Sequence, residues 1–127
     1  MVQSINSKVD LAVDGTFHMS LPTYGKIMVG NHGFEFYNDH NVADYVQIPW
    51  QEVDRVVVSV EFGGKWIPRF AFQTKHNGRY MFSAKDPKRV LRAVREYIPA
   101  DHIVKPLGFW AVVRRGVSAI KQRLHHK

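Results

Sequence analysis

The histidines are the residues of this chain most often associated with catalysis or metal binding, and their spacing indicates neither. The chain has seven: His18, His32, His40, His76, His102, His125 and His126. None lies in an HExxH or HxH pattern with a carboxylate at metal-ligand spacing. His32 and His76 lie in expected turns, where a polar residue is ordinary. The terminal pair, His125 and His126, predicts at most a weak contact with a stray metal ion.

The other groups that could carry chemistry are equally uninformative. The acidic residues of the first half are scattered, and no two form an obvious general acid and base pair. The chain has no GxSxG, P-loop or GxGxxG motif and no cysteine, so disulfides, thiolate catalysis and cysteine-based metal sites are excluded. We therefore expect a protein that is not an enzyme, with no cofactor, no metal and no small-molecule substrate.

The distribution of charge is the strongest chemical signal. The net charge is +7, but residues 1–62 carry −5 and residues 63–127 carry +12. Such asymmetry predicts a polyanionic partner, meaning anionic lipid, nucleic acid or an acidic protein surface. The alternative is a bipolar domain whose two halves attract each other within the fold.

Residues 107–127 predict a basic amphipathic helix. Its apolar stripe, at helical spacing, is Trp110, Val113, Val117, Ile120 and Leu124, and Phe109 and Val112 widen the stripe near its start. Its cations are Arg114, Arg115, Lys121, Arg123 and Lys127. Three interpretations stay open. The stripe packs back on the chain's own core, it lies at a membrane interface with its cations toward anionic lipid, or it fills a groove of a partner protein.

A second helix is predicted between Asp86 as N-cap and Pro99 as terminator, with Pro87 at its first position. Its apolar face is Val90, Leu91, Val94 and Tyr97 or Ile98, and its basic face is Lys88, Arg89, Arg92 and Arg95. The basic face could follow phosphates, but the helix offers no exposed aromatic residue for base stacking. Nucleic acid is therefore not the partner we expect.

The chain before this helix predicts seven short strands separated by turns. They cover residues 8–19, 27–29, 34–37, 45–50, 53–62, 65–75 and 79–84. In the first, Val9, Leu11, Val13, Phe17 and Met19 alternate with other residues and predict the buried face. An α+β, mainly β fold follows: a pleckstrin-homology-like or GRAM-like antiparallel barrel with a C-terminal capping helix. We expect residues 1–99 to form this domain, and residues 100–127 to form a linker and the basic amphipathic helix.

Five segments together resemble one small bacterial family of unknown function, called ManO. They are LPTYGKIMVGNHGFEFYND, IPWQEVD, GKWIPRFAF, SAKDPKRVLRAVREYIPAD and FWAVVRRG. Members are encoded beside mannose-class sugar permeases of the phosphoenolpyruvate-dependent phosphotransferase system. The resemblance brings no catalytic residues. It implies an accessory protein that docks on the membrane subunits of such a permease, or on the adjoining anionic lipid, and modulates sugar uptake.

That setting gives further expectations. The protein would be cytoplasmic and peripheral at the inner face of the cell membrane, since no signal peptide or membrane-spanning run is seen in the sequence. Lys65, Trp66 and Arg69 are a possible second contact beside a Gly-rich turn. The alternative function is a DNA-binding transcriptional regulator of the sugar-uptake operon. A third, phosphoryl transfer to His32 or His40, has only the presence of surface histidines in its favour.

Overall fold

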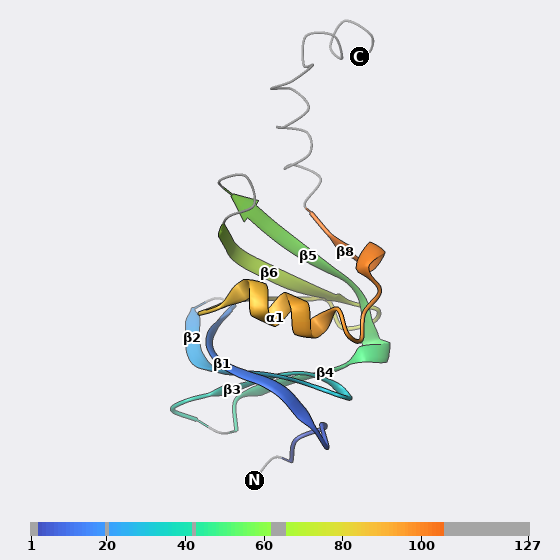
Figure 1. Ribbon diagram of the computed structural model, residues 1–127. Helices are drawn as coiled ribbons and strands as arrows, with labels where there is room; N and C mark the ends of the chain where they lie inside the picture. The colour runs from blue at the N-terminus through green and yellow to red at the C-terminus, as the bar shows by residue number, and fades with distance from the viewer. Residues whose placement is uncertain (1–2, 20, 42, 62–65, 106–127) are drawn as a thin grey trace, which may run out of the picture.

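The computed structural model describes residues 3–19, 21–41, 43–61 and 66–105 (Figure 1). The strands are β1 Val9–His18, β2 Pro22–Gly30, β3 Gly33–Asn38, β4 Tyr45–Pro49, β5 Val53–Glu61, β6 Trp66–Thr74, β7 Arg79–Ala84 and β8 Ile103–Val104. The helix α1 spans Pro87–Val94, and single 3-10 turns cover Trp50–Glu52 and Ala100–His102. All seven predicted strands are therefore present, in the predicted order, before the helix.

The strands form one eight-stranded sheet in the order β4-β3-β2-β1-β7-β6-β5-β8. All neighbouring pairs are antiparallel except the last, in which Ile103 and Val104 of β8 pair parallel with Val56 and Val57 of β5. The expected barrel closure is not found, because β4 and β8 are the edges of the sheet and are not paired with each other in the described part of the chain. The expected linker at residues 100–105 thus contains a strand that the sequence did not reveal.

Two glycines allow the sheet to bend at β1 and β2. Gly15 and Gly25 are directly opposite each other in the register of these strands. A β-carbon on Gly25 would come within 2.0 Å of the carbonyl oxygen of Tyr37, and one on Gly15 within 2.2 Å of the Ile27 side chain. Strand β1 then continues past the bend and pairs through residues 15–18 with β7, which joins the two halves of the sheet.

The core fills the bend and is dominated by phenylalanine. Its fully buried rings are Phe34, Phe36, Phe70, Phe72 and Phe82. The ring centroids of Phe34 and Phe72 are 4.3 Å apart, and those of Phe34 and Phe82 are 4.8 Å apart. These inward positions alternate along β3, β6 and β7, as period-two patterning requires. Phe70 and Phe72 of β6 thus lie at the centre of the core.

Helix α1 lies across the two halves of the sheet and covers this core (Figure 1). Val90 and Val94 are fully buried and Leu91 is nearly so, which confirms the predicted apolar face. The helix is shorter than predicted, ending at Val94, and residues 95–98 continue as tight turns that bury Ile98. Asp86 occupies the N-cap position, but its side chain makes no capping hydrogen bond.

Trp50 links the end of the helical segment to the sheet. Its indole nitrogen donates a hydrogen bond of 2.9 Å to the carbonyl oxygen of Gly30. Its ring stacks on Tyr97, with centroids 5.3 Å apart and planes 9° from parallel. The Tyr97 hydroxyl in turn donates to Asp10 on β1. This anchor fixes how α1 lies on the sheet, and therefore where its outer face points.

The N-terminal segment before β1 is held on the outer face of the sheet by a buried carboxylate. Glu35 is fully buried, and its oxygens accept hydrogen bonds from the Ser4 hydroxyl at 2.6 Å and the Ile5 amide at 2.9 Å. The Tyr37 hydroxyl donates to the same carboxylate at 2.8 Å. Burying a carboxylate is costly unless it is hydrogen-bonded, and here at least three donors surround it.

One part of the predicted burial pattern is wrong. Leu11 and Phe17 are buried as predicted, but Val9 is 43% exposed and Met19 is 65% exposed. A register irregularity between Val9 and Leu11 breaks the alternation at one end of β1. At the other end the ladder stops at the pair of His18 and Pro22, so Met19 lies beyond the last paired residue.

Candidate docking surface

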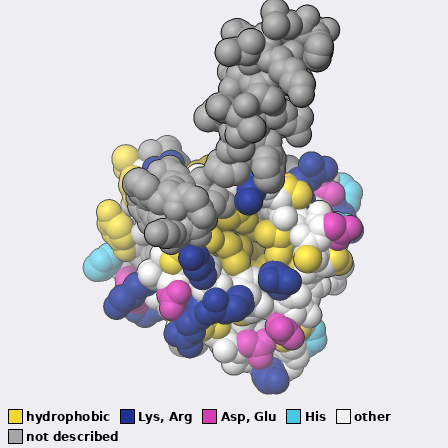
Figure 2. All heavy atoms as spheres, turned by 45° about the horizontal axis from the view of Figure 1, so that its top comes forward, with side chains coloured by type: hydrophobic (Ala, Val, Ile, Leu, Met, Phe, Trp, Pro, Cys, Tyr) yellow, Lys and Arg dark blue, Asp and Glu magenta, His cyan; other side chains and the backbone are white. Residues whose placement is uncertain are grey.

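The outer face of α1 is uniformly basic. Lys88, Arg89 and Arg92 on α1, and Arg95 at its C-terminal cap, are all exposed, because the opposite side of the helix is occupied by its buried valines and leucine. Figure 2 shows Lys and Arg side chains gathered across the middle of the face over which α1 lies, with hydrophobic side chains beside them. We call these four residues the basic face.

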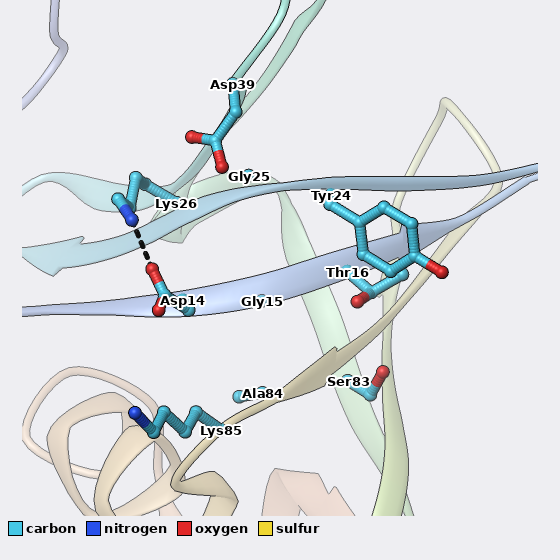
Figure 3. A pocket seen from close by; sticks show the side chains of 10 residues that line it. All are labelled: Asp14, Gly15, Thr16, Tyr24, Gly25, Lys26, Asp39, Ser83, Ala84 and Lys85. Carbon is cyan, nitrogen blue, oxygen red and sulfur yellow. Dashed lines mark hydrogen bonds and ion pairs between the residues drawn. The ribbon is translucent and has the colours of Figure 1, made fainter.

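A groove begins at the N-terminal end of the basic face and runs onto β1 and β2. Its first part, of about 550 Å³, is lined by Ala12, Val13, Asp14, Lys26, Lys85, Asp86 and Arg89. The adjoining part, of about 530 Å³, is lined by Asp14, Gly15, Thr16, Tyr24, Gly25, Lys26, Asp39, Ser83, Ala84 and Lys85 (Figure 3). Asp14, Lys26 and Lys85 line both parts, so the groove is continuous.

Cross-strand pairing determines which side chains face the groove. Asp14 is opposite Lys26, and Thr16 is opposite Tyr24, in the register of β1 and β2. Thr16 is also opposite Ser83 on β7. In Figure 3 the Asp14 carboxylate lies between the ammonium groups of Lys26 and Lys85, with Tyr24, Thr16 and Ser83 toward the other end. The groove therefore has a charged end near α1 and a hydroxyl-bearing end near the β1–β2 turn.

At the charged end of the groove, the negative charge of Asp14 is offset by the positive charges of Lys26 and Lys85. The hydrogen bond from Lys26 and its positive charge lower the pKa of Asp14, with a further contribution from Lys85. The same contact raises the pKa of Lys26. Both groups are solvent-exposed, so the pair contributes little to stability. Three cations and three carboxylates line the groove, and its charge is therefore close to zero, unlike that of the basic face.

His18 lies near the hydroxyl-bearing end. Its Nε2 atom is 2.7 Å from the Ser83 hydroxyl. Partial burial lowers the pKa of His18, and the charge of Arg69 lowers it further. Arg69 itself is exposed on β6. The Ser83 hydroxyl and the His18 ring are thus within hydrogen-bond distance, but no carboxylate contacts His18 among the hydrogen bonds of the described chain.

Two further observations concern other kinds of site. In the described ranges, no three His, Asp or Glu side chains are grouped so that they could hold a metal ion. No helix among the residues that the structure describes is both long and apolar enough to cross a bilayer.

The predicted site residues are only partly placed. The tail residues Phe109, Trp110, Val113, Arg114, Arg115, Val117, Ile120, Lys121 and Arg123 lie outside the described residues, as does Lys65. Trp66 begins β6, paired with Glu61, but its side chain is also outside the described part. Arg69 on β6 is separated from His18 on β1 by strand β7, and it is near enough for its charge to lower the pKa of His18.

The groove residues were not found from the sequence. Asp14 and Lys26 lie on different strands, and only the register of β1 and β2 brings them together. Lys85 precedes α1 in the sequence, and its amide donates a hydrogen bond of 3.0 Å to the carbonyl oxygen of Asp14, which brings it to the groove. The one available signal was the Gly15 and Gly25 pair, since glycines within strands often mark a bend or a close approach of backbone.

The chain belongs to a known protein family without an assigned role. The family is described as "Domain of unknown function (DUF956)", and its model matches residues 1–117. No curated protein matches the chain.

Two solved structures are similar in fold. The C-terminal domain of an unknown protein from Leishmania infantum has a TM-score of 0.61 at 11% identity, covering 71% of this chain and 83% of that one. The hSac2 domain from human phosphoinositide phosphatase Sac2 has a TM-score of 0.50 at 13% identity, covering 78% of this chain and 76% of that one. At these identities the likeness concerns the fold alone.

Proposed function

We propose that this protein is a non-enzymatic docking module that binds the anionic cytosolic face of a membrane through the basic face of α1. In the setting that the ManO resemblance implies, the docking site is a mannose-class permease or the lipid around it, and docking modulates sugar uptake. We further propose that the bent sheet and its covering helix are a pleckstrin-homology-like or GRAM-like scaffold, open where β4 and β8 form its edges.

The observation that carries this proposal is the one-sided composition of α1. The exposed cations of the helix and its C-terminal cap are Lys88, Arg89, Arg92 and Arg95. Between residues 85 and 96 the only acidic residues are Asp86 and Glu96. None of the four basic residues belongs to a salt bridge found in the described part of the chain. Because no ion pair within the described residues engages these cations, their charge is available to attract an external anion.

The expected strength of this attraction is substantial. Each Lys or Arg near an anionic membrane surface contributes about 1 kcal/mol, and four would contribute about 4 kcal/mol. The apolar stripe and cations predicted at residues 109–123 would add a second contact, which raises the overall affinity through proximity. The stacking of Trp50 on Tyr97 anchors the segment that follows α1 to the sheet, and so helps to fix the direction in which the basic face points.

The alternative, a DNA-binding regulator, would use the same positive charge. A recognition helix must project its residues into the major groove, whereas Val90 and Val94 hold α1 flat against the core. The eight residues of α1 also make a short reading element. Membrane docking is therefore the function that we prefer.

The test is co-sedimentation of the full chain with vesicles of neutral lipid, with or without one-third anionic lipid. We expect pelleting only with anionic vesicles, weakened by salt. Replacing Arg89→Gln and Arg92→Gln keeps helix propensity and should weaken binding about 30-fold, because two contributions of about 1 kcal/mol are removed. The matched control is Arg55→Gln with Lys75→Gln, which removes the same charge from exposed positions on β5 and after β6.

The control variant should bind almost as the parent protein does. Equal loss in both variants would show that only net charge matters, and would refute the basic face as the docking site. If the parent protein stays in the supernatant with every vesicle but binds duplex DNA with a steep salt dependence, the alternative function replaces this one.

A further inference from the structure

The turn between β1 and β2 exposes large apolar side chains. Met19 is 65% exposed, Leu21 is 76% exposed, and Tyr24 on the adjoining part of β2 is 64% exposed. We call these three residues the apolar tip. Tight turns normally carry Gly, Pro, Asn, Asp or Ser, each for a conformational reason. Ser20 and Pro22 are such residues, but Met19 and Leu21 offer no conformational advantage, and their exposure to water is unfavourable. The presence of these two side chains therefore needs another explanation.

The chemistry of the side chains changes in a regular order along β2. Leu21 is outermost, Tyr24 follows with its phenol group, and Lys26 is two residues further on the same face of the strand. At about 3.3 Å per residue, Lys26 is about 16 Å from Leu21 along the chain. An apolar group, then an amphipathic ring, then a cation is the order met from the hydrocarbon boundary of a bilayer outward to its phosphates.

The groove connects the apolar tip to the basic face. Tyr24 and Lys26 line one part of it, and Lys26 and Arg89 line the other. In Figure 1 the beginning of β2 and the N-terminal end of α1 lie on the same side of the molecule, and α1 contacts β2. A single flat surface, such as that of a membrane, could therefore contact the apolar tip and the basic face at the same time.

We propose that the apolar tip enters the boundary between headgroups and acyl chains of a lipid bilayer. The inference rests on the proposed function, because the basic face would hold the molecule at the membrane while the tip inserts. The groove beside the tip is nearly neutral, with Asp14 and Asp39 among its lining residues. Attraction at this end is therefore apolar and largely insensitive to salt.

The absence of cysteine from the chain makes a direct test possible. Leu21→Cys is labelled with an environment-sensitive fluorophore and mixed with vesicles containing one-third anionic lipid. The control is Gln51→Cys, an exposed position near the opposite end of the sheet, beyond the Gly30 end of β2. We expect the emission of the Leu21 label to rise severalfold and shift to the blue, while the Gln51 label changes little.

A second variant tests the energetic contribution. Met19→Ser with Leu21→Ser should weaken vesicle binding by at least about tenfold, and this loss should persist in high salt, because apolar burial is involved. The loss caused by Arg89→Gln with Arg92→Gln should instead shrink as salt rises.

The outcomes separate the two proposals. If the protein pellets with vesicles and the Leu21 label does not respond, the tip inference is wrong and the docking function stands. If the label responds without vesicles as protein concentration rises, a second copy covers the tip, and the inference is again wrong. If nothing pellets and the label stays unchanged, both proposals fail.

Discussion

Replacing the buried carboxylate of Glu35 should destabilise the protein and release its N-terminal segment. Glu35→Ala removes the acceptor for the Ser4 hydroxyl, the Ile5 amide and the Tyr37 hydroxyl. A hydrogen bond to a charged group contributes about 1.5–3 kcal/mol, but residues before β1 can regain water when they detach, so the contributions do not add fully. We expect a loss of about 3 kcal/mol in the free energy of unfolding.

Urea unfolding followed by tryptophan fluorescence measures this loss, and the midpoint of thermal unfolding should fall by about 10 °C. Hydrogen exchange of the Ile5 amide should accelerate in the same variant. The control is Glu96→Ala, an exposed position where we expect a change within about 0.5 kcal/mol. A loss below about 1 kcal/mol for Glu35→Ala, or one no larger than the control's, would refute the role assigned to the buried network.

Three other predictions concern the bend, the anchor and the pH response. Gly25→Ala should destabilise the protein by more than about 2 kcal/mol in urea unfolding, because its β-carbon would meet the Tyr37 carbonyl oxygen at 2.0 Å. Trp50→Phe should cost about 1–2 kcal/mol in the same assay, since it removes the donor to the buried Gly30 carbonyl while keeping an aromatic ring. Burial holds the pKa of His18 below its ordinary 6.5, so protonation favours the unfolded chain. His18 thus contributes stability above pH 6.5 that is lost as the pH falls through the lowered pKa, and His18→Gln should flatten the decline in stability on acidification.

The strands and the covering helix could be predicted because their signals are local. Alternating apolar residues identify β3, β6 and β7, and Pro87 with Val90, Leu91 and Val94 identifies α1. The edge strand β8 could not be predicted, because Ile103 and Val104 are too few residues to show a period. Whether the sheet closes into a barrel depends on whether its two edge strands, β4 and β8, come close enough to pair. No local residue pattern encodes the distance between them.

The site illustrates the same division. The basic face of α1 was readable from helical spacing alone. Asp14 and Lys26 are twelve residues apart in the sequence, and they meet only because the register of β1 and β2 places them opposite each other. That register could not be read from the sequence. Met19 was assigned to the buried face because its spacing continues that of Phe17, and only the end of the β1–β2 ladder at His18 shows that it is exposed. Turn positions break the period of the strands beside them, so hydrophobic residues there are easily misassigned.

The most direct test of the docking function is co-sedimentation of the parent protein with membranes from cells that contain or lack the mannose-class permease. We predict that the protein pellets with permease-containing membranes, and that Arg89→Gln with Arg92→Gln reduces pelleting while Arg55→Gln with Lys75→Gln does not. Equal pelleting with both membranes would restrict the docking site to the lipid. A protein that stays in the supernatant with both would contradict the proposed function.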